Sequence, residues 1–161
     1  MIRKNKKRGF TLIEILVVIG IIAILAAVVL VAVNPSRMFK MARDSQRTSN
    51  VNAILNAVSQ NIAEHKGKFI CVGEDFQLPT DSVTIVRNKT SSDTLLIYPG
   101  DIAKCLVPDY ISSLPFDPSK VGTHYTDPTD YDTGYFIGID ATGRITASST
   151  GELVASIVVT R

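Results

Sequence analysis

The sequence lacks the motifs by which most enzymes are recognised. It contains no nucleotide-binding glycine loop, no nucleophile elbow and no catalytic dyad with supporting context. Its two histidines, His65 and His124, do not have the spacing of a metal-binding pair. We therefore expect no enzymatic activity, and a chain of 161 residues has room for one domain.

Acidic residues are missing from the start of the chain. Five of the 17 Lys and Arg residues lie in the first nine positions, and all 15 acidic residues come later. The body of the protein is therefore mildly acidic, although the whole chain has a formal net charge of +2. Broad nucleic-acid binding depends on clustered Lys and Arg side chains. We expect no direct nucleic-acid binding.

Charge is also missing from Ile15 to Val33, a run of 19 residues. As an α-helix this run would span about 28 Å, close to the thickness of a bilayer core. Asn34 and Pro35 end the run. Proline removes a backbone donor and disfavours helix at the preceding residue, so we expect a kink or a break there.

Helical periodicity resumes after Pro35 and continues to a predicted stop at Gly67. An apolar stripe, predicted to face a sheet, consists of Val51, Ile54, Leu55, Val58 and Ile62. The opposite face is predicted to carry Arg43, Asp44, Arg47, Asn50 and Asn61. Four cations follow the apolar run: Arg37, Lys40, Arg43 and Arg47. One hypothesis is that they contact lipid phosphates or acids on adjacent subunits, and the alternative is that they form a solvated basic face.

From Lys68 onward the sequence indicates strands and turns. Strands are predicted at 83–86, 95–98, 135–139, 144–147 and 153–159, with a tight hairpin loop at 140–143 and a turn-rich stretch at 115–132. The predicted fold class is α+β. A long N-terminal helix, its first half transmembrane, would pack its second half on a small antiparallel β-sheet.

The chain has only two cysteines, Cys71 and Cys105, and no CxxC pair. With an apparent export signal upstream, we expect a disulfide formed in an oxidising compartment. The bridge would stabilise the fold by about 3–4 kcal/mol in the chain-entropy model. The alternative is a pair of buried free thiols.

The basic start and the apolar run together resemble a known family. An ordinary secretory signal is cut after its apolar core, but a cut near Asn34 is disfavoured because proline follows. The segment Arg8-Gly9-Phe10-Thr11-Leu12-Ile13-Glu14 resembles the cleavage motif of the prepilin family. The resemblance covers roughly the first 35 residues and implies a pilin-like fold. It also implies cleavage between Gly9 and Phe10 by a membrane aspartyl peptidase, with N-methylation of Phe10.

Glu14 is an acidic residue at the head of an apolar run, where it needs a partner. Cleavage would leave a cationic amine on Phe10, one helical turn away. The amine of a neighbouring subunit is the expected partner, and this ion pair would set the axial stagger of a filament. The alternative is that Glu14 extends toward the lipid headgroups. The resemblance leaves open whether the helix unwinds between Gly20 and Pro35.

These observations divide the chain into four parts. They are a leader peptide (1–9), a transmembrane and assembly segment (10–35), an amphipathic helical segment (36–66) and a β-rich head (67–161). The resemblance implies a structural subunit of a type IV pilus or of a type II secretion-like pseudopilus. Its expected partners are further copies of itself, a prepilin peptidase and methyltransferase, a pilus assembly platform, and membrane lipid before assembly.

The expected location is a single pass through the cytoplasmic membrane, with a cytoplasmic N-terminus and the head outside. The subunit would then enter an extracellular filament or a periplasmic or cell-wall pseudopilus. Two alternatives remain: a membrane-anchored surface binding domain that does not polymerise, and a secreted enzyme with a conventional signal. The sequence does not identify the filament system, nor whether the subunit is major or minor.

Two weaker motifs lie in the head. Asp127, Asp130 and Asp132 resemble the acidic loop by which some major pseudopilins hold calcium, and the alternative is that they are solvated aspartates in turns. No other cofactor is expected. The segment Asn88-Lys89-Thr90 matches the short N-glycosylation pattern.

Overall fold

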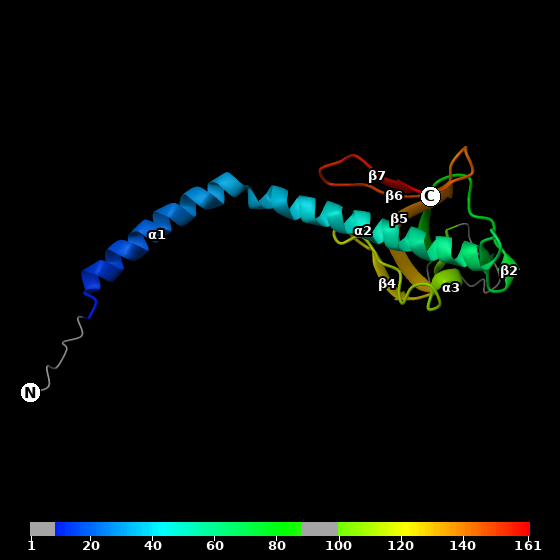
Figure 1. Cartoon of the computed structure of the whole chain (residues 1–161), viewed down its shortest axis with the longest axis horizontal. Coiled ribbons are helices and arrows are strands. Elements are labelled where there is room, and N and C mark those ends of the chain that lie inside the picture. The colour runs from blue at the N-terminus through cyan, green and yellow to red at the C-terminus, as the bar shows by residue number, and fades with distance from the viewer. Residues whose placement is uncertain (1–8, 88–99) are drawn as a thin grey trace, which may run out of the picture. The chain divides into compact units, whose positions relative to one another are not determined.

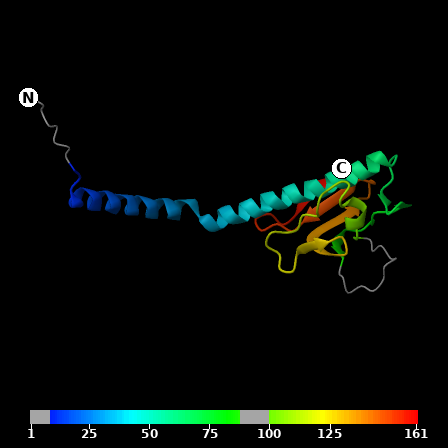
Figure 2. The same cartoon turned by 90° about the horizontal axis from the view of Figure 1, so that it is seen from below.

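The computed structural model describes residues 9–87 and 100–161 (Figure 1). They divide into two compact units, one ending at Phe39 and the other running from Lys40 to Arg161. The first unit contains helix α1 (Leu12–Val33) and the start of helix α2 (Pro35–Glu64). In the second unit, the rest of α2 lies along one face of a β-sheet (Figure 2).

Helix α1 is uninterrupted for 22 residues and passes through Gly20 without unwinding. It ends at Val33, and the backbone of the next residue, Asn34, is left-handed with φ 46°. Asparagine tolerates this conformation better than most residues because its short polar side chain bonds locally. The predicted break before Pro35 is confirmed, and the interruption is confined to Asn34.

The head contains an antiparallel sheet in the order β3-β5-β6-β7, with β4 paired to β5. Its strands are β3 (Val83–Arg87), β4 (His124–Asp127), β5 (Asp130–Ile139), β6 (Ile145–Ser149) and β7 (Ile157–Thr160). A separate two-stranded hairpin consists of β1 (Ile70–Cys71) and β2 (Glu74–Asp75), and α3 (Ala103–Leu106) is a short helix. The predicted α+β class is confirmed.

The turn between β5 and β6 forms where the sequence predicts it. Ile139 pairs with Ile145, and the Asp140 carboxylate accepts the N–H groups of Thr142 (2.8 Å) and Arg144 (3.0 Å). Gly143 adopts φ +82°, a conformation that costs glycine little. This hairpin fixes the register of the two central strands.

The core lies between α2 and the sheet, as the apolar stripe predicts. Val51, Ile54, Leu55 and Val58 are fully buried, and Ile62 packs against them partly exposed. The sheet contributes Ile85, Tyr131, Tyr135 and Ile137 to the same cluster. Burial of such side chains stabilises a fold by about 1.5–3 kcal/mol each.

One strand was not predicted, and another begins later than predicted. The stretch 115–132 contains β4, which the sequence does not indicate because its side chains are mostly polar and partly exposed. Pairing of its backbone with β5 holds it in place. The predicted strand at 153–159 begins only at Ile157, because the N–H groups of Glu152 and Leu153 bond to a side chain of α2 instead. The predictions at 95–98 and at Asn88-Lys89-Thr90 lie outside the described residues.

Candidate functional site

The residues at the proposed cleavage point precede the first helix. Thr11 is the N-cap of α1, so Gly9 and Phe10 lie outside the helix. The Thr11 N–H and hydroxyl both donate to Glu14 Oε2 at 2.8 Å, and the Glu14 N–H donates to Thr11 Oγ1 at 3.3 Å. This is a capping box, in which the first turn satisfies two of its own donors.

The capping box assigns a role to Thr11 that the sequence analysis missed. The signal was present, because a threonine three residues before a glutamate at the start of an apolar run is the sequence form of this motif. Glu14 therefore has polar partners within its own helix. Both of these donors are neutral, and within residues 9–87 and 100–161 no cation pairs with the Glu14 carboxylate.

Helix α1 offers an apolar surface on all sides. Residues Leu12–Ala32 form one helix long and apolar enough to cross a membrane, and none of this stretch is buried. The exposed fractions of its large apolar side chains range from 50% to 84%. A surface of this size in water is strongly unfavourable, because each such side chain gains about 1.5–3 kcal/mol on burial.

A group of charged side chains fastens α2 to two loops of the head. We call it the α2 charge cluster, and its members are Arg43, Asp44, Arg47, Asp117 and Glu152. Arg47 bonds to Asp117 (2.7 and 3.0 Å), to Asp44 (2.6 Å) and to Glu152 (3.1 Å). Arg43 forms two further bonds of 2.6 Å with Glu152. Figure 1 shows the loop between β6 and β7, which carries Glu152, running beside α2.

Electrostatics keep the α2 charge cluster ionised. Burial opposes ionisation of Asp117, but hydrogen bonds from Arg47 and two backbone N–H groups outweigh it and hold its pKa below the usual range. Hydrogen bonds from Arg43 lower the pKa of Glu152 to about 2, against a smaller opposing effect of burial. Burial also opposes ionisation of Asp44. Hydrogen bonds from the N–H groups of Glu152 and Leu153 and from the Arg47 side chain outweigh this effect and hold its pKa below the usual range.

This cluster corrects the predicted solvent face of α2. Asp44, Arg47 and Asn61 are buried, with 9%, 3% and 2% of their surfaces exposed. They continue the apolar stripe at helical spacings of three and four residues, on the same side of α2 as Val51 and Val58. Their polarity favoured exposure, but each finds partners in the fold. Backbone N–H groups of Glu152 and Leu153 bond to Asp44, acids bond to Arg47, and backbone carbonyls accept from Asn61. Both interpretations of Arg43 and Arg47 are therefore wrong, since these side chains contact acids of their own head.

Cys71 and Cys105 form a disulfide, as expected. The bridge joins β1 to α3 across a sequence separation of 34 residues. Next to it, the buried Asn61 amide donates to the carbonyls of Ile70 (2.9 Å) and Cys105 (3.2 Å). The last turns of α2, the β1 segment and α3 are thus held together covalently and by hydrogen bonds.

The three aspartates of the candidate calcium loop serve local turns and pairs. Asp127 accepts the N–H and hydroxyl of Thr129, and Asp132 accepts the N–H of Gly134. Asp130 lies 3.5 Å from a ring nitrogen of His124. Within residues 9–87 and 100–161, no group of three or more His, Cys, Asp or Glu side chains is arranged to hold a metal ion.

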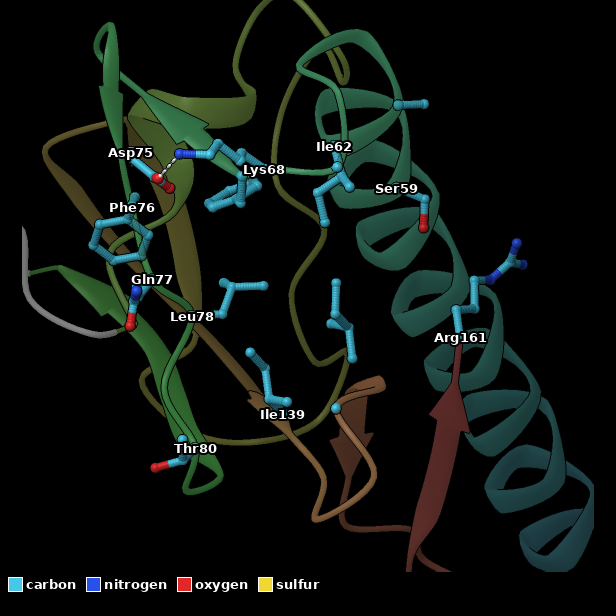
Figure 3. Close-up of a pocket in the computed structure, with 15 residues that line it drawn as sticks. Ser59, Ile62, Lys68, Asp75, Phe76, Gln77, Leu78, Thr80, Ile139 and Arg161 are labelled. Carbon is cyan, nitrogen blue, oxygen red and sulfur yellow. Dashed lines mark hydrogen bonds and ion pairs between the residues drawn. The ribbon is translucent and has the colours of Figure 1, made fainter.

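A pocket of about 780 Å³ lies between the end of α2, the segment after it and the β5–β6 hairpin (Figure 3). Its wall includes the apolar residues Ile62, Phe69, Phe76, Leu78, Ile139 and Ile145. At its rim, Lys68 forms a 2.6 Å ion pair with Asp75. Among the described residues that line it, Asp75 is the one acid and none is His or Cys. This described lining leaves room for an apolar group.

Comparisons with known proteins agree with the N-terminal motif. Residues 4–30 match the family model described as the prokaryotic N-terminal methylation motif. This motif is the hallmark of type IV prepilins and pseudopilins. No curated protein and no solved structure matched the chain. The similarity to known proteins is thus found in the segment that contains Gly9, Phe10 and Glu14.

Proposed function

We propose that this chain is a structural subunit of a type IV pilus or of a type II secretion-like pseudopilus. It is cut after Gly9, methylated on Phe10 and polymerised through α1. The observation that carries the proposal is the position of α1, an apolar helix exposed on all sides, within and directly after the methylation motif. The wider partners are a prepilin peptidase and methyltransferase and a pilus assembly platform.

The apolar surface of α1 supports both states of such a subunit. Before assembly, lipid tails cover the helix, whose 21-residue apolar stretch is about as long as a bilayer core is thick. Once it leaves the membrane, only similar apolar surfaces can replace the lipid. The α1 helices of other copies supply them, and burial then stabilises the filament.

Glu14 supplies a polar contact within this apolar packing. Its two accepted hydrogen bonds end on the same oxygen, Oε2, and come from uncharged groups of Thr11. Cleavage after Gly9 creates an amine on Phe10. In the low-dielectric interior of a helix bundle, the amine of a neighbouring copy stabilises the carboxylate and fixes the stagger between subunits.

The leader and the head complete the proposed topology. Five basic residues precede the span and four follow it, at Arg37, Lys40, Arg43 and Arg47, so the charge difference gives a cytoplasmic N-terminus only slight support. The head, with its disulfide, then lies outside the cytoplasm in an oxidising compartment, first at the membrane and later in a filament or pseudopilus. Calcium at Asp127, Asp130 and Asp132 is not part of the proposal, because Asp127 and Asp132 bond within local turns and Asp130 pairs with His124.

The test is the yield of filaments sheared and pelleted from cells that make the protein. Wild-type filaments should contain the processed chain, whereas Glu14→Ala should be processed normally but give a reduced yield. The competing hypothesis is a single-pass anchored binding domain that does not polymerise. It predicts no pelletable filaments from either protein, and equal yields from both would exclude the role of Glu14.

A further inference from the structure

The break at Asn34 has a polar requirement of its own. The Asn34 carbonyl accepts the N–H groups of Arg37 (3.1 Å) and Met38 (3.4 Å), and its side chain accepts the Arg37 N–H at 3.3 Å. These bonds cap the start of α2. The last carbonyls of α1 lack N–H donors from a following helical turn. The helix stops at Val33, and Pro35 has no N–H to donate.

Unsatisfied carbonyls are not tolerated in hydrocarbon, where no water can bond to them. The break therefore belongs at the polar boundary of the membrane. The length of α1 agrees, because Leu12–Ala32 covers about 32 Å against a core of about 30 Å. Both arguments place Asn34 among the headgroups when α1 spans the bilayer.

The residues directly after Asn34 have the chemistry of an interface. Arg37 is exposed, Met38 is 52% exposed and Phe39 is 64% exposed. Arg37 lies five positions beyond Ala32, within about 8 Å of chain, which is the depth of the headgroup layer. No acidic residue occurs between Glu14 and Asp44, so this stretch is purely cationic.

We propose that Arg37, Met38 and Phe39 form a juxtamembrane anchor that binds anionic phospholipid headgroups. The Arg37 guanidinium pairs with lipid phosphates, while the apolar side chains of Met38 and Phe39 lie in the same interfacial layer. A lipid surface fits better than a second protein copy for two reasons. The anchor is continuous with the membrane span, and its charge is complementary to phosphate. The proposal rests on insertion of α1 into a membrane and does not require polymerisation.

The anchor gives the subunit a second membrane contact besides its span. Cations near an anionic surface each strengthen binding roughly fivefold. Lys40, the next residue in the sequence, adds a second cation at this depth. Extraction of a subunit into a filament must therefore release these headgroup contacts as well as the lipid around α1.

The experiment uses tryptophan as a reporter, since the chain has none. Full-length Phe39→Trp is reconstituted in vesicles that contain phosphatidylcholine and phosphatidylglycerol. Lipids brominated at shallow or deep positions then quench its fluorescence. Phe39→Trp should emit at short wavelength and be quenched most by shallow bromines. Ile22→Trp, in the middle of α1, should be quenched most by deep bromines.

Comparing anionic with zwitterionic lipid distinguishes the role of the cations in the anchor from that of its apolar side chains. Brominated phosphatidylglycerol should quench Phe39→Trp several-fold more than brominated phosphatidylcholine at equal mole fraction. Adding Arg37→Gln and Lys40→Gln should abolish this preference while the emission wavelength stays short. The matched control is Val121→Trp, on a side chain of the head that is 98% exposed and outside the first unit.

Three results would overturn the anchor. Emission of Phe39→Trp at the wavelength of free tryptophan, without quenching, would show that water covers it. A short-wavelength emission that is lost when the protein is diluted in lipid would show that a second copy covers it. Failure of deep bromines to quench Ile22→Trp would show that α1 is not inserted. By contrast, loss of filaments with an intact anchor would count against the proposed function alone.

Discussion

The guanidinium of Arg47 forms a two-point ion pair with the carboxylate of Asp117, with Nε–Oδ2 2.7 Å and Nη2–Oδ1 3.0 Å. Both side chains are buried, at 3% and 5% exposed. The two residues lie 70 positions apart, on α2 and on the loop before β4. Because Arg47 also bonds to Asp44 and Glu152, this one side chain joins α2 to two separate loops of the head.

Removal of Arg47 should be strongly destabilising. Arg47→Met keeps much of the aliphatic length but leaves Asp117 and Asp44 buried without their cation. The expected loss is about 3–5 kcal/mol of unfolding free energy, as for other broken buried pairs. Chemical denaturation of the full-length protein in detergent measures it.

Arg43→Met is the matched control for Arg47. Arg43 is on the same helix and pairs with Glu152, but its side chain is 34% exposed, and Glu152 keeps its bond to Arg47. We expect a much smaller loss of unfolding free energy than for Arg47→Met, because solvent screens an exposed ion pair. Equal losses in the two variants would contradict the structural role assigned to Arg47.

The α2 charge cluster predicts acid sensitivity. The pKa values of Asp44, Asp117 and Glu152 are lowered in the fold, in the case of Glu152 to about 2. As the pH falls, the carboxylates of the unfolded chain are therefore protonated before those of the folded chain. The stabilisation that these three groups contribute is complete above about pH 5 and declines as the pH falls through about 4 toward 2. Melting temperatures measured between pH 7 and pH 2 should show this decline. Glu152→Gln should decline less steeply, and a curve parallel to the wild type would refute the linkage.

Reduction of the Cys71–Cys105 bridge should lower stability without changing the fold. For a sequence separation of 34 residues, the chain-entropy model gives a loss of about 3–4 kcal/mol. Denaturation of the Cys71→Ser, Cys105→Ser double variant measures it, with the oxidised wild type as reference. If gel mobility of the native protein does not change on reduction, and both thiols react with an alkylating reagent, the bridge is absent in solution.

Two substitutions in the capping box distinguish the charge of Glu14 from its role in capping the helix. Glu14→Gln retains the cap, since glutamine also fits this position, but removes the charge. Thr11→Ala retains the charge and removes the cap, at a cost of about 1 kcal/mol. If the charge sets the register, Glu14→Gln should reduce filament yield to near background, and Thr11→Ala by no more than about fivefold. The reverse order would assign the role of Glu14 to helix capping.

The fold class could be predicted because its strongest signals are local. The apolar run, the break at Asn34 and Pro35, the stripe of α2 and the β5–β6 turn each follow from residues close in sequence. The N-terminal processing motif is local as well. Its capping box was also readable from Thr11 and Glu14, since their spacing defines the motif.

The buried charges of α2 could not be predicted in the same way. Asp44, Arg47 and Asn61 occupy stripe positions, and their polarity favoured the solvent face. The head residues that bond to Asp44 and Arg47 are Asp117 and Glu152, which lie about 70 to 110 positions away, and Asn61 bonds to Cys105, 44 positions away. No local pattern indicates that these segments meet. Strand β4 was not predicted for a related reason. Backbone pairing with β5 holds it in place, and it has no apolar face that its sequence could reveal.

Mass analysis of the native N-terminus is the direct test of processing after Gly9. A processed prepilin has a mature chain that starts at Phe10 and is heavier by one methyl group on its amine. An intact leader would instead indicate an anchored protein that is not processed. A terminus near Asn34 would indicate a conventional signal, and either of these two results would rule out processing as a prepilin.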